Sequence, residues 1–191
     1  EEASLRERFK AAQALEGEST ELEIDRANVK KRLQTDHARA TSRLNAFSLI
    51  ISKAIQELYR DRAGGFVVEA TDNGPEFRIS IQGDRGGGIA QMEIFCFDYA
   101  LYTILLEQRR GPGFLIHDSH LFDGVDERQI ARAVLMGGAL TDRLGGQYIV
   151  TMNSDIYDRL PLPENFDRTK VVAKPRLSDA NVESGLFGFQ F

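Results

Sequence analysis

The first third of the chain has the hydrophobic spacing of a long helix. Apolar residues recur in steps that alternate between three and four, which is the a/d pattern of a coiled coil. The stripe, weak at its start and strong at its end, is Val29, Leu33, Ala40, Leu44, Phe47, Ile51, Ala54 and Leu58. Thr20 and Glu23 have the spacing of a capping box just after Gly17, so we expect a short helix before Gly17 and a long one over 20–62.

The length of this second helix decides between two interpretations. At about 1.5 Å per residue it would extend roughly 60 Å, which exceeds a small domain. A helix lying wholly on its own domain is the simpler alternative. The length favours a coiled-coil arm over 1–62 followed by a separate lobe over 63–191.

A β-hairpin is expected next. Gly64-Gly65 should end the helix. The runs 66–70 and 76–81 are rich in Val, Ile and Phe, and the turn-forming residues 72–75 separate them, which is the pattern of two antiparallel strands.

The glycine-rich loop 83–88 leads into a helix over 89–109 that is apolar on nearly every side, and such a helix is buried. Consecutive glycines let backbone N–H groups approach an anion, and the helix N-terminus adds partial positive charge. Arg85 adds a full charge. A flexible glycine turn is the alternative.

The segment after Gly113 predicts a parallel sheet. An apolar strand over 114–118, an amphipathic helix over 126–143 and a second strand over 148–152 are joined by short connections, as in a βαβ unit. Residues 171–173 are expected to form one more strand, and the apolar tail 186–191 to pack back on the sheet. The fold class is therefore α/β.

Charge and composition narrow the function classes. The net charge of −5 and the pI near 5.3 give no reason to expect nucleic-acid binding from bulk charge. The single cysteine, Cys96, excludes an internal disulfide and favours a reducing, cytoplasmic compartment. Its apolar neighbours predict a buried structural thiol. We expect no membrane-spanning segment, and the start within a charged helical pattern indicates a fragment of a longer protein.

Asp118 is the first candidate for chemistry because it stands where the strand 114–118 ends. The carboxyl ends of parallel strands hold metal ions and phosphates, and a carboxylate there suits Mg²⁺. An Asp that caps a nearby turn is the alternative. Asp126 is expected to cap the helix 126–143, with Glu127 favourable in its first turn.

Two further arrangements involve the same edge. Asp118 and His120 share a face of an extended chain, and with Asp123 they could hold a transition metal whose bound water acts as nucleophile. Asn153 ends the next strand and would lie near Asp118, where a polar side chain could sense a terminal phosphate. A simple strand-to-loop turn would also explain Asn153.

The order of these parts resembles the C-terminal half of an ABC-type ATPase head, most closely that of the SMC-like coiled-coil ATPases. More specifically, the segments 94–98, 114–119 and 122–129 look like a bacterial family of SMC-like proteins catalogued by a C-terminal domain of unknown function. The tail 186–191 fits that family as well. The resemblance covers residues 20–191.

The resemblance implies roles for residues already singled out. Gly86, Gly87 and Gly88 stand at the signature loop, which meets the γ-phosphate bound by a partner head. Asp118 stands as the Walker B aspartate that orients Mg²⁺. Asp123 and Asp126 fall in the D-loop, and Asn153 stands at the switch position, where ABC enzymes usually carry His.

Two departures from the family pattern matter. Ser119 occupies the place of the catalytic Glu and cannot act in the same way as a general base, which leaves His120, Asp123 or Glu127 for that role. No Gly-x-x-x-x-Gly-Lys-Ser/Thr occurs in the chain, so the phosphate-cradling P-loop is missing. ATP and Mg²⁺ would therefore bind only with an N-terminal P-loop half.

The resemblance implies a lobe that supplies the signature loop, Walker B aspartate and D-loop for ATP-dependent head dimerisation in bacterial DNA repair, maintenance or defence. Its partners would be the P-loop half, a second copy through heads or coiled coil, and possibly DNA. Two other classes stay open. One is a non-catalytic coiled-coil interaction module with a decayed site. The other is a metal-dependent hydrolase using Asp118, His120 and Asp123.

Overall fold

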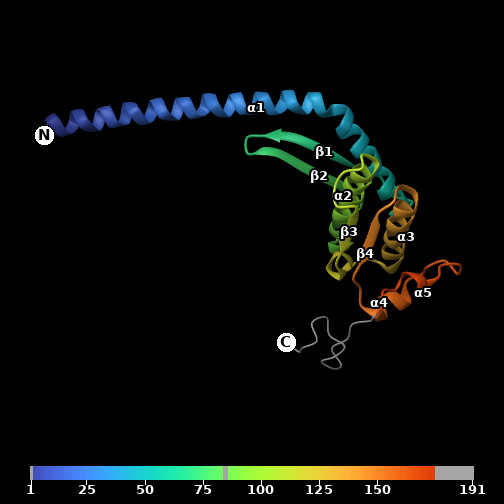
Figure 1. Ribbon diagram of the computed structural model, residues 1–191. Coiled ribbons are helices and arrows are strands. Elements are labelled where there is room, and N and C mark those ends of the chain that lie inside the picture. The colour runs from blue at the N-terminus through green and yellow to red at the C-terminus, as the bar shows by residue number, and fades with distance from the viewer. Residues whose placement is uncertain (1, 84–85, 175–191) are drawn as a thin grey trace. The chain divides into compact units, whose positions relative to one another are not determined.

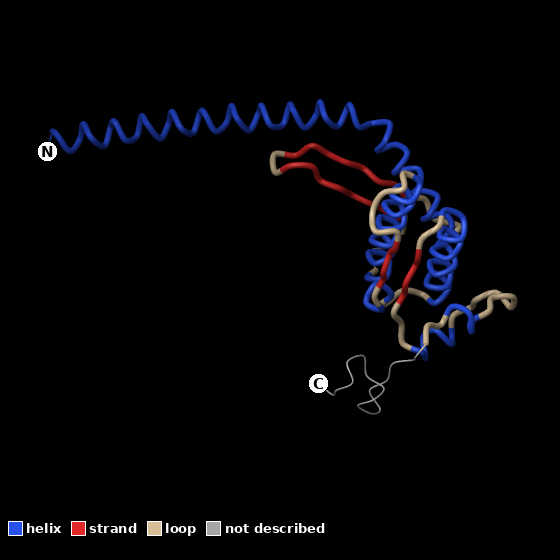
Figure 2. Tube along the Cα trace, viewed as in Figure 1, coloured by secondary structure: helices blue, strands red, loops and turns tan. Residues whose placement is uncertain are grey.

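The computed structural model describes residues 2–83 and 86–174 of the chain (Figures 1 and 2). They form a mixed α/β fold with an antiparallel and a parallel strand pair. The chain divides into two units, Glu1–Leu160 and Pro161–Phe191. In chain order the elements are α1 (Glu2–Tyr59), β1 (Gly64–Thr71), β2 (Gly74–Ile81), α2 (Gly87–Glu107), β3 (Phe114–His117), the 3-10 helix η1 (Ser119–Phe122), α3 (Glu127–Leu144), β4 (Gln147–Val150), α4 (Ser154–Arg159) and α5 (Arg168–Val171).

Helix α1 is continuous, so the expected break near Gly17 is wrong. A glycine inside a helix costs only about 1 kcal/mol relative to alanine, and no side chain crowds Gly17. The Thr20 hydroxyl does not cap a new helix. It donates a hydrogen bond back to the Glu16 carbonyl, at 2.9 Å, as Thr often does in the interior of a helix.

The end of α1 also differs from the expectation. The helix stops at Tyr59, and Arg60 takes the left-handed conformation with φ 60°. The Arg60 amide donates to the Gln56 carbonyl at 2.7 Å. Gly64-Gly65 therefore does not end the helix. It begins β1, where a Cβ on Gly64 would meet the Ser80 carbonyl oxygen and the Ile55 side chain.

The hydrophobic stripe of α1 is buried near the C-terminal end of the helix and exposed nearer its N-terminal end. Its C-terminal part is buried in the core of the first unit, where α1 contacts β1 and α2. The aromatic ring of Phe47 packs edge-on against Phe66 and Phe97, with centroids 4.9 and 5.3 Å away. Val29, by contrast, is 62% exposed. The strongest part of the coiled-coil pattern is thus the part that packs within its own unit.

The hairpin is confirmed. β1 and β2 pair antiparallel in the register Thr71↔Gly74, with Asp72 and Asn73 in the turn. Gly74 has φ 111°, a conformation that suits glycine. Lys30 of α1 forms an ion pair with Asp72 at 2.8 Å.

Helix α2 is confirmed, but its burial is uneven. Its inner side includes Phe95 and Cys96, whereas Ile94 is 51% and Leu101 43% exposed, so the expectation of burial on nearly every side is wrong. In length and apolar composition α2 would also suit a membrane span, contrary to the expectation that no segment does. Its contacts with α1, β2, β3, η1 and α3 fit the core helix of a folded domain.

β3, α3 and β4 form the expected βαβ unit with parallel strands (Figure 2). The register pairs Leu115 with Tyr148 and Ile116 with Ile149. Because side chains alternate along a strand, Leu115 and Tyr148 share one face of the pair, and Ile116 and Ile149 share the other.

The second unit is described only up to residue 174. Its short helix α5 begins after Asp167, whose carboxylate accepts hydrogen bonds from the backbone N–H and the hydroxyl of Thr169. The strand expected over 171–173 is wrong, because this cap starts a helical turn that includes Val171. The tail 186–191 lies outside the described residues.

Candidate functional site

The candidate site lies at the carboxyl edge of the β3–β4 pair. The strands are parallel, so both end at the same edge. The Thr151 amide donates to the His117 carbonyl at 3.0 Å and extends the pairing to the last residue of β3. Asp118 follows β3 directly, and Asn153 follows β4 after two residues. The fold therefore brings Asp118 and Asn153 to one edge, as expected from the order of the strands.

Asp118 is exposed, and its carboxylate caps η1. Oδ1 accepts hydrogen bonds from the His120 backbone N–H at 3.1 Å and from the Ser119 hydroxyl at 2.9 Å. The His120 N–H, followed by the Ser119 hydroxyl, lowers the pKa of Asp118 below its ordinary value. A carboxylate stabilised in this way is ionised near neutral pH, which is the state that binds cations. The capping role considered for Asp118 is confirmed.

His120 and Asp123 form an exposed pair at the two ends of η1. The imidazole Nδ1 lies 3.0 Å from Asp123 Oδ2. The hydrogen bond to the Asp123 carboxylate, followed by its charge, raises the pKa of His120 above its ordinary value. The imidazole is thus turned toward Asp123, while Asp118 is bonded to backbone and hydroxyl groups.

A metal centre built from these residues finds no further ligands nearby. Within 2–83 and 86–174, no group of three or more His, Cys, Asp or Glu side chains is arranged to hold a metal ion. A transition-metal site in a hydrolase uses three protein ligands as a rule. Asp118, His120 and Asp123 are close in sequence, but the Asp118 carboxylate caps η1, whereas the Asp123 carboxylate pairs with the His120 imidazole.

The loop after η1 packs against the start of α2. A Cβ on Gly88 would collide with the Gly124 carbonyl, and would lie 3.1 Å from the Val125 Cα. Gly124 itself has φ 71°. The close approach requires glycine at position 88, whereas Gly124 is favoured by its left-handed backbone conformation. The glycine loop and the segment that contains Asp123 and Asp126 are therefore neighbours within one lobe.

The other residues of the glycine loop have limited roles here. Gly86 is the N-cap of α2 and offers no side-chain cap. Gly87 begins the helix, and no atom lies within 4 Å of the position of a Cβ on it. The first-turn N–H groups of α2 are thus not capped by a side chain. Arg85 lies outside the described residues.

Asp126 is the N-cap of α3, as expected. Its Oδ1 accepts from the Arg128 backbone N–H at 2.9 Å, and its carboxylate pairs with the Arg128 guanidinium at 2.9 and 3.2 Å. The side-chain hydrogen bond from Arg128 is the largest cause of its lowered pKa. These contacts engage both carboxylate oxygens within the lobe.

Asn153 is exposed and occupies the N-cap position of α4, but its side chain makes no capping hydrogen bond. Helix α4 was not expected from the sequence. Its first residues follow β4 so closely that Asn153 stays at the sheet edge with a free amide side chain among the described residues.

A buried polar network next to the site was not expected. His117 is 5% exposed. Its Nδ1 lies 2.9 Å from the Tyr148 hydroxyl, and its Nε2 lies 3.3 Å from Asp98 Oδ2. The network is satisfied when Tyr148 donates to Nδ1 and Nε2–H donates to Asp98. Asp98, a charged residue inside the apolar helix, was a signal for it in the sequence.

The network of His117, Tyr148 and Asp98 fixes the position of the strand end that carries Asp118. His117 immediately precedes Asp118, its ring packs near Phe95 of α2 with centroids 5.6 Å apart, and Tyr148 belongs to β4. Buried and satisfied polar groups specify one packing arrangement. α2, β3 and β4 are thus held together just below the carboxyl edge.

Cys96 is buried in α2, as expected. Burial raises the pKa of its thiol to about 12. A thiol with this pKa is almost entirely protonated at neutral pH and is a poor nucleophile. Cys96 therefore contributes packing and no chemistry to the site.

Solved structures of similar fold include SMC ATPase heads. One, from work on ATP-driven dimerization and DNA-stimulated activation of SMC ATPases, is 16% identical with a TM-score of 0.48, over 63% of this chain and 74% of that chain. A SmcHead bound to the C-winged helix domain of ScpA is 11% identical with a TM-score of 0.45, over 62% and 38%. An Smc head with an extended coiled coil, bound to the C-terminal domain of ScpA derived from Pyrococcus furiosus, is 13% identical with a TM-score of 0.42, over 60% and 30%.

These likenesses concern the fold and say nothing of the activity of this chain. No curated protein matches it. A family model described as an uncharacterised protein conserved in bacteria, DUF2326, matches residues 54–191, and this agrees with the resemblance to a bacterial family with a domain of unknown function. The match extends over most of the chain, and the protein therefore belongs to the DUF2326 family.

Proposed function

We propose that this chain is the C-terminal lobe of an SMC-like ATPase head, with residues 1–62 as its arm and 63–191 as its lobe. The observation that carries the proposal is an uncovered apolar face on the β3–β4 pair. Phe114 is 46%, Ile116 53% and Ile149 38% exposed, and the register places all three on the same face.

A parallel sheet normally has both faces covered. Here α2 and α3 contact one face, where Phe95 lies against His117 and Gly137 against Tyr148. The opposite face offers β-branched and aromatic side chains to solvent, which is unfavourable by about 25 cal/mol for each Å² of apolar surface. A sheet of two strands also has fewer strands than an ordinary sheet, which has about four to six. Both features favour a lobe completed by further strands and helices.

The uncovered face adjoins the edge that carries Asp118. A P-loop half that completed the sheet would bring a phosphate-binding loop to this edge, because ligands of open α/β sheets bind outside the carboxyl ends of the strands. Asp118 is exposed and ionised there, which suits the orientation of Mg²⁺. The uncapped start of α2 with Gly86, Gly87 and Gly88 suits a phosphate presented by a second head.

ATP-Mg²⁺ would supply the phosphoanhydride whose cleavage drives head separation. Ser119 cannot serve as the general base, and its hydroxyl is already donated to Asp118. His120 is the better candidate, since its paired imidazole is exposed at the same edge. A raised pKa leaves a smaller fraction of the imidazole unprotonated near pH 7 and able to accept a proton, so slow hydrolysis is expected.

The proposal also concerns partners and location. Two heads would dimerise around ATP, the arms of two copies would pair, and DNA would be the substrate of arm movement in repair, maintenance or defence. SMC ATPases of known structure are described as dimerising on ATP and responding to DNA. The reduced, buried Cys96 suits a cytoplasmic location.

ATP turnover by the complete protein tests this proposal. Asp118→Asn removes the ionised carboxylate and should lower turnover roughly 10- to 100-fold. Asp158→Asn on α4 is the matched control, because Asp158 is also an exposed aspartate but belongs to α4 and not to the segment that follows β3. Equal turnover in the two variants would exclude the Walker B role.

A non-catalytic coiled-coil interaction module is a second candidate. The engagement of both Asp118 and Asp126 in capping contacts favours it, as does Ser119. In that case the complete protein would show no turnover above background while its oligomeric state stayed independent of ATP. The metal-dependent hydrolase gains no support from the described residues, where no metal-binding group is found, and metal analysis of the purified chain would test it directly.

A further inference from the structure

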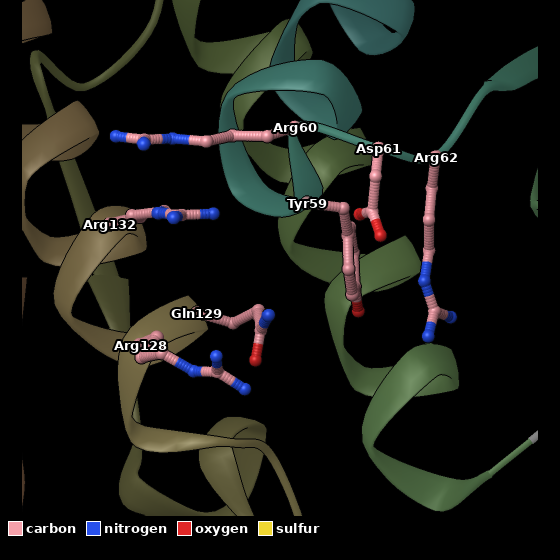
Figure 3. Close-up of a pocket in the computed structure, with 7 residues that line it drawn as sticks. All are labelled: Tyr59, Arg60, Asp61, Arg62, Arg128, Gln129 and Arg132. Atoms are coloured by element: carbon pink, nitrogen blue, oxygen red, sulfur yellow. The ribbon is translucent and has the colours of Figure 1, made fainter.

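A cavity lined by arginines lies between the end of α1 and the start of α3 (Figure 3). Its volume is about 250 Å³, and its lining includes Arg60, Arg62, Arg128 and Arg132, against one carboxylate, Asp61. The chain as a whole has a net charge of −5. Four guanidinium groups around one small cavity in an acidic protein mark a local concentration of positive charge.

Two of these guanidinium groups are held in place by the protein. Arg132 Nη1 donates to the Leu58 carbonyl at 2.6 Å, so it satisfies an open carbonyl near the end of α1. Arg128 is fixed by its two contacts with Asp126. In Figure 3 both side chains extend from α3 toward Tyr59. Each keeps N–H donors beyond those that these contacts use.

The other two guanidinium groups have no carboxylate partner among the described residues. Arg60 is exposed and makes no described side-chain hydrogen bond or ion pair, and its left-handed backbone sets the direction in which the side chain leaves α1. Arg62 lies over the Tyr59 ring, 4.9 Å from its centroid. Arg62 Nη1 is buried against Gly83 and has no hydrogen-bond partner within the described part of the chain.

We propose that this cavity binds a phosphate group, as inorganic phosphate or as the terminal phosphate monoester of a larger molecule. Guanidinium groups match phosphate oxygens with paired donors. A monoester is close to a dianion at pH 7, and Arg60, which is exposed and has no carboxylate partner among the described residues, would offset part of that charge. Pockets for drug-sized ligands have volumes of about 300–1,000 Å³, so this cavity has room for a phosphate group but not for an attached nucleoside.

The location gives such a site a mechanical consequence. Arg60 and Arg62 follow α1, and Arg128 and Arg132 lie in the first turns of α3. A bound phosphate would join the base of the long helix to the helix that follows the Asp118 edge. The proposal does not depend on ATP turnover, because it concerns the isolated chain and a cavity that includes neither Asp118 nor the glycine loop.

Calorimetric titration of the 191-residue chain with inorganic phosphate tests the site. Arg60→Gln/Arg128→Gln should weaken phosphate binding at least about tenfold, since each lost charge-assisted hydrogen bond weakens binding by about that factor. Arg110→Gln/Arg143→Gln is the control with the same change of charge, because both residues are exposed and line no part of the cavity. The control should bind as the parent does.

Folding and ligand source are checked separately. Arg60→Gln alone should retain the parent circular dichroism spectrum, because Arg60 has no described side-chain partner, and should still weaken binding. A short single-stranded oligonucleotide with a 5′-phosphate, compared with the same strand lacking it, separates the sources. Preference for the phosphorylated strand identifies an end phosphate, and binding of inorganic phosphate alone identifies a small ligand.

Three results would overturn the proposal. The first is absence of phosphate binding at concentrations up to about 10 mM, which corresponds to a negligible affinity. The second is equal weakening in the control variant, which would indicate a general effect of charge. The third is equal binding of the two oligonucleotides with loss of both in the Arg60→Gln/Arg128→Gln variant, which would assign the cavity to a phosphodiester backbone.

Discussion

Neighbouring glycines in α3 have very different surroundings. A Cβ on Gly137 would overlap the Tyr148 ring, whereas no atom lies within 4 Å of a Cβ on Gly138. Gly137 thus lets β4 approach α3 closely, and it leaves the Tyr148 hydroxyl in place beside His117. Gly138 has only the cost that glycine carries in any helix.

We expect Gly137→Ala to destabilise the chain by about 1–3 kcal/mol, because the added methyl group overpacks the contact with Tyr148. Gly138→Ala should stabilise it by roughly 0.5–1 kcal/mol through helix propensity. Urea denaturation of the two variants beside the parent measures both changes. Similar effects of the two substitutions would show that α3 and β4 are packed less closely than described.

His120 should titrate above the ordinary histidine pKa of about 6.5, because the imidazolium is paired with Asp123. The pairing stabilises the fold at pH values below the ordinary pKa and is lost as pH rises through the raised pKa. Both groups are exposed, so the effect on the free energy of unfolding is small. NMR titration should show the His120 pKa fall in Asp123→Asn, and an unchanged pKa would mean that the pair does not form.

At the scale of elements, α1 combines a core segment with an exposed one. Ile51, Ala54, Ile55 and Leu58 are buried, while Leu15, Leu22 and Val29 are between 62% and 66% exposed at heptad spacing. Isolated exposed apolar residues are common, but three of them seven residues apart on one helix would supply one of the two core positions of a coiled-coil heptad. We therefore expect two copies of the arm to pair.

Sedimentation analysis tests this pairing. Leu22→Lys/Val29→Lys should shift the chain toward monomer, because charges at the seam oppose close approach of two helices. Leu49→Lys is the control on the same helix, since Leu49 is 56% exposed and lies outside the seam. A parent chain that is monomeric at all concentrations would exclude pairing of the arms.

At the scale of the whole molecule, the uncovered face of the β3–β4 pair is the feature that would distinguish one lobe of a larger domain from a complete domain. Ile116→Glu should change the unfolding free energy of the isolated chain by no more than about 0.5 kcal/mol, because Ile116 is exposed there. In the complete protein the same substitution would bury a charge, and we expect misfolding or loss of turnover. Equal tolerance in both settings would show that nothing covers this face.

Much of this arrangement is predictable from local patterns. The hairpin, α2, α3 with its Asp126 cap, and the parallel pairing of β3 with β4 follow from periodicity, turn residues and capping, which act between residues close in sequence. The same reasoning places Asp118 and Asn153 at one edge. It also misplaces the start and end of α1 and the strand at 171–173, because single Gly, Thr and Val residues shift local preference by less than neighbouring contacts do.

The sequence by itself determined the order of the longer helices and the strands from α1 to β4, because hydrophobic spacing and capping residues act over one or two turns. Only the tertiary structure decided which part of the α1 stripe is core, that Gly88 meets Gly124, that Asp98 and Tyr148 enclose His117, and that arginines from the end of α1 and the start of α3 line one cavity. These contacts join residues far apart in the chain. Their formation depends on how closely the packed elements approach each other, and no local sequence pattern specifies that approach.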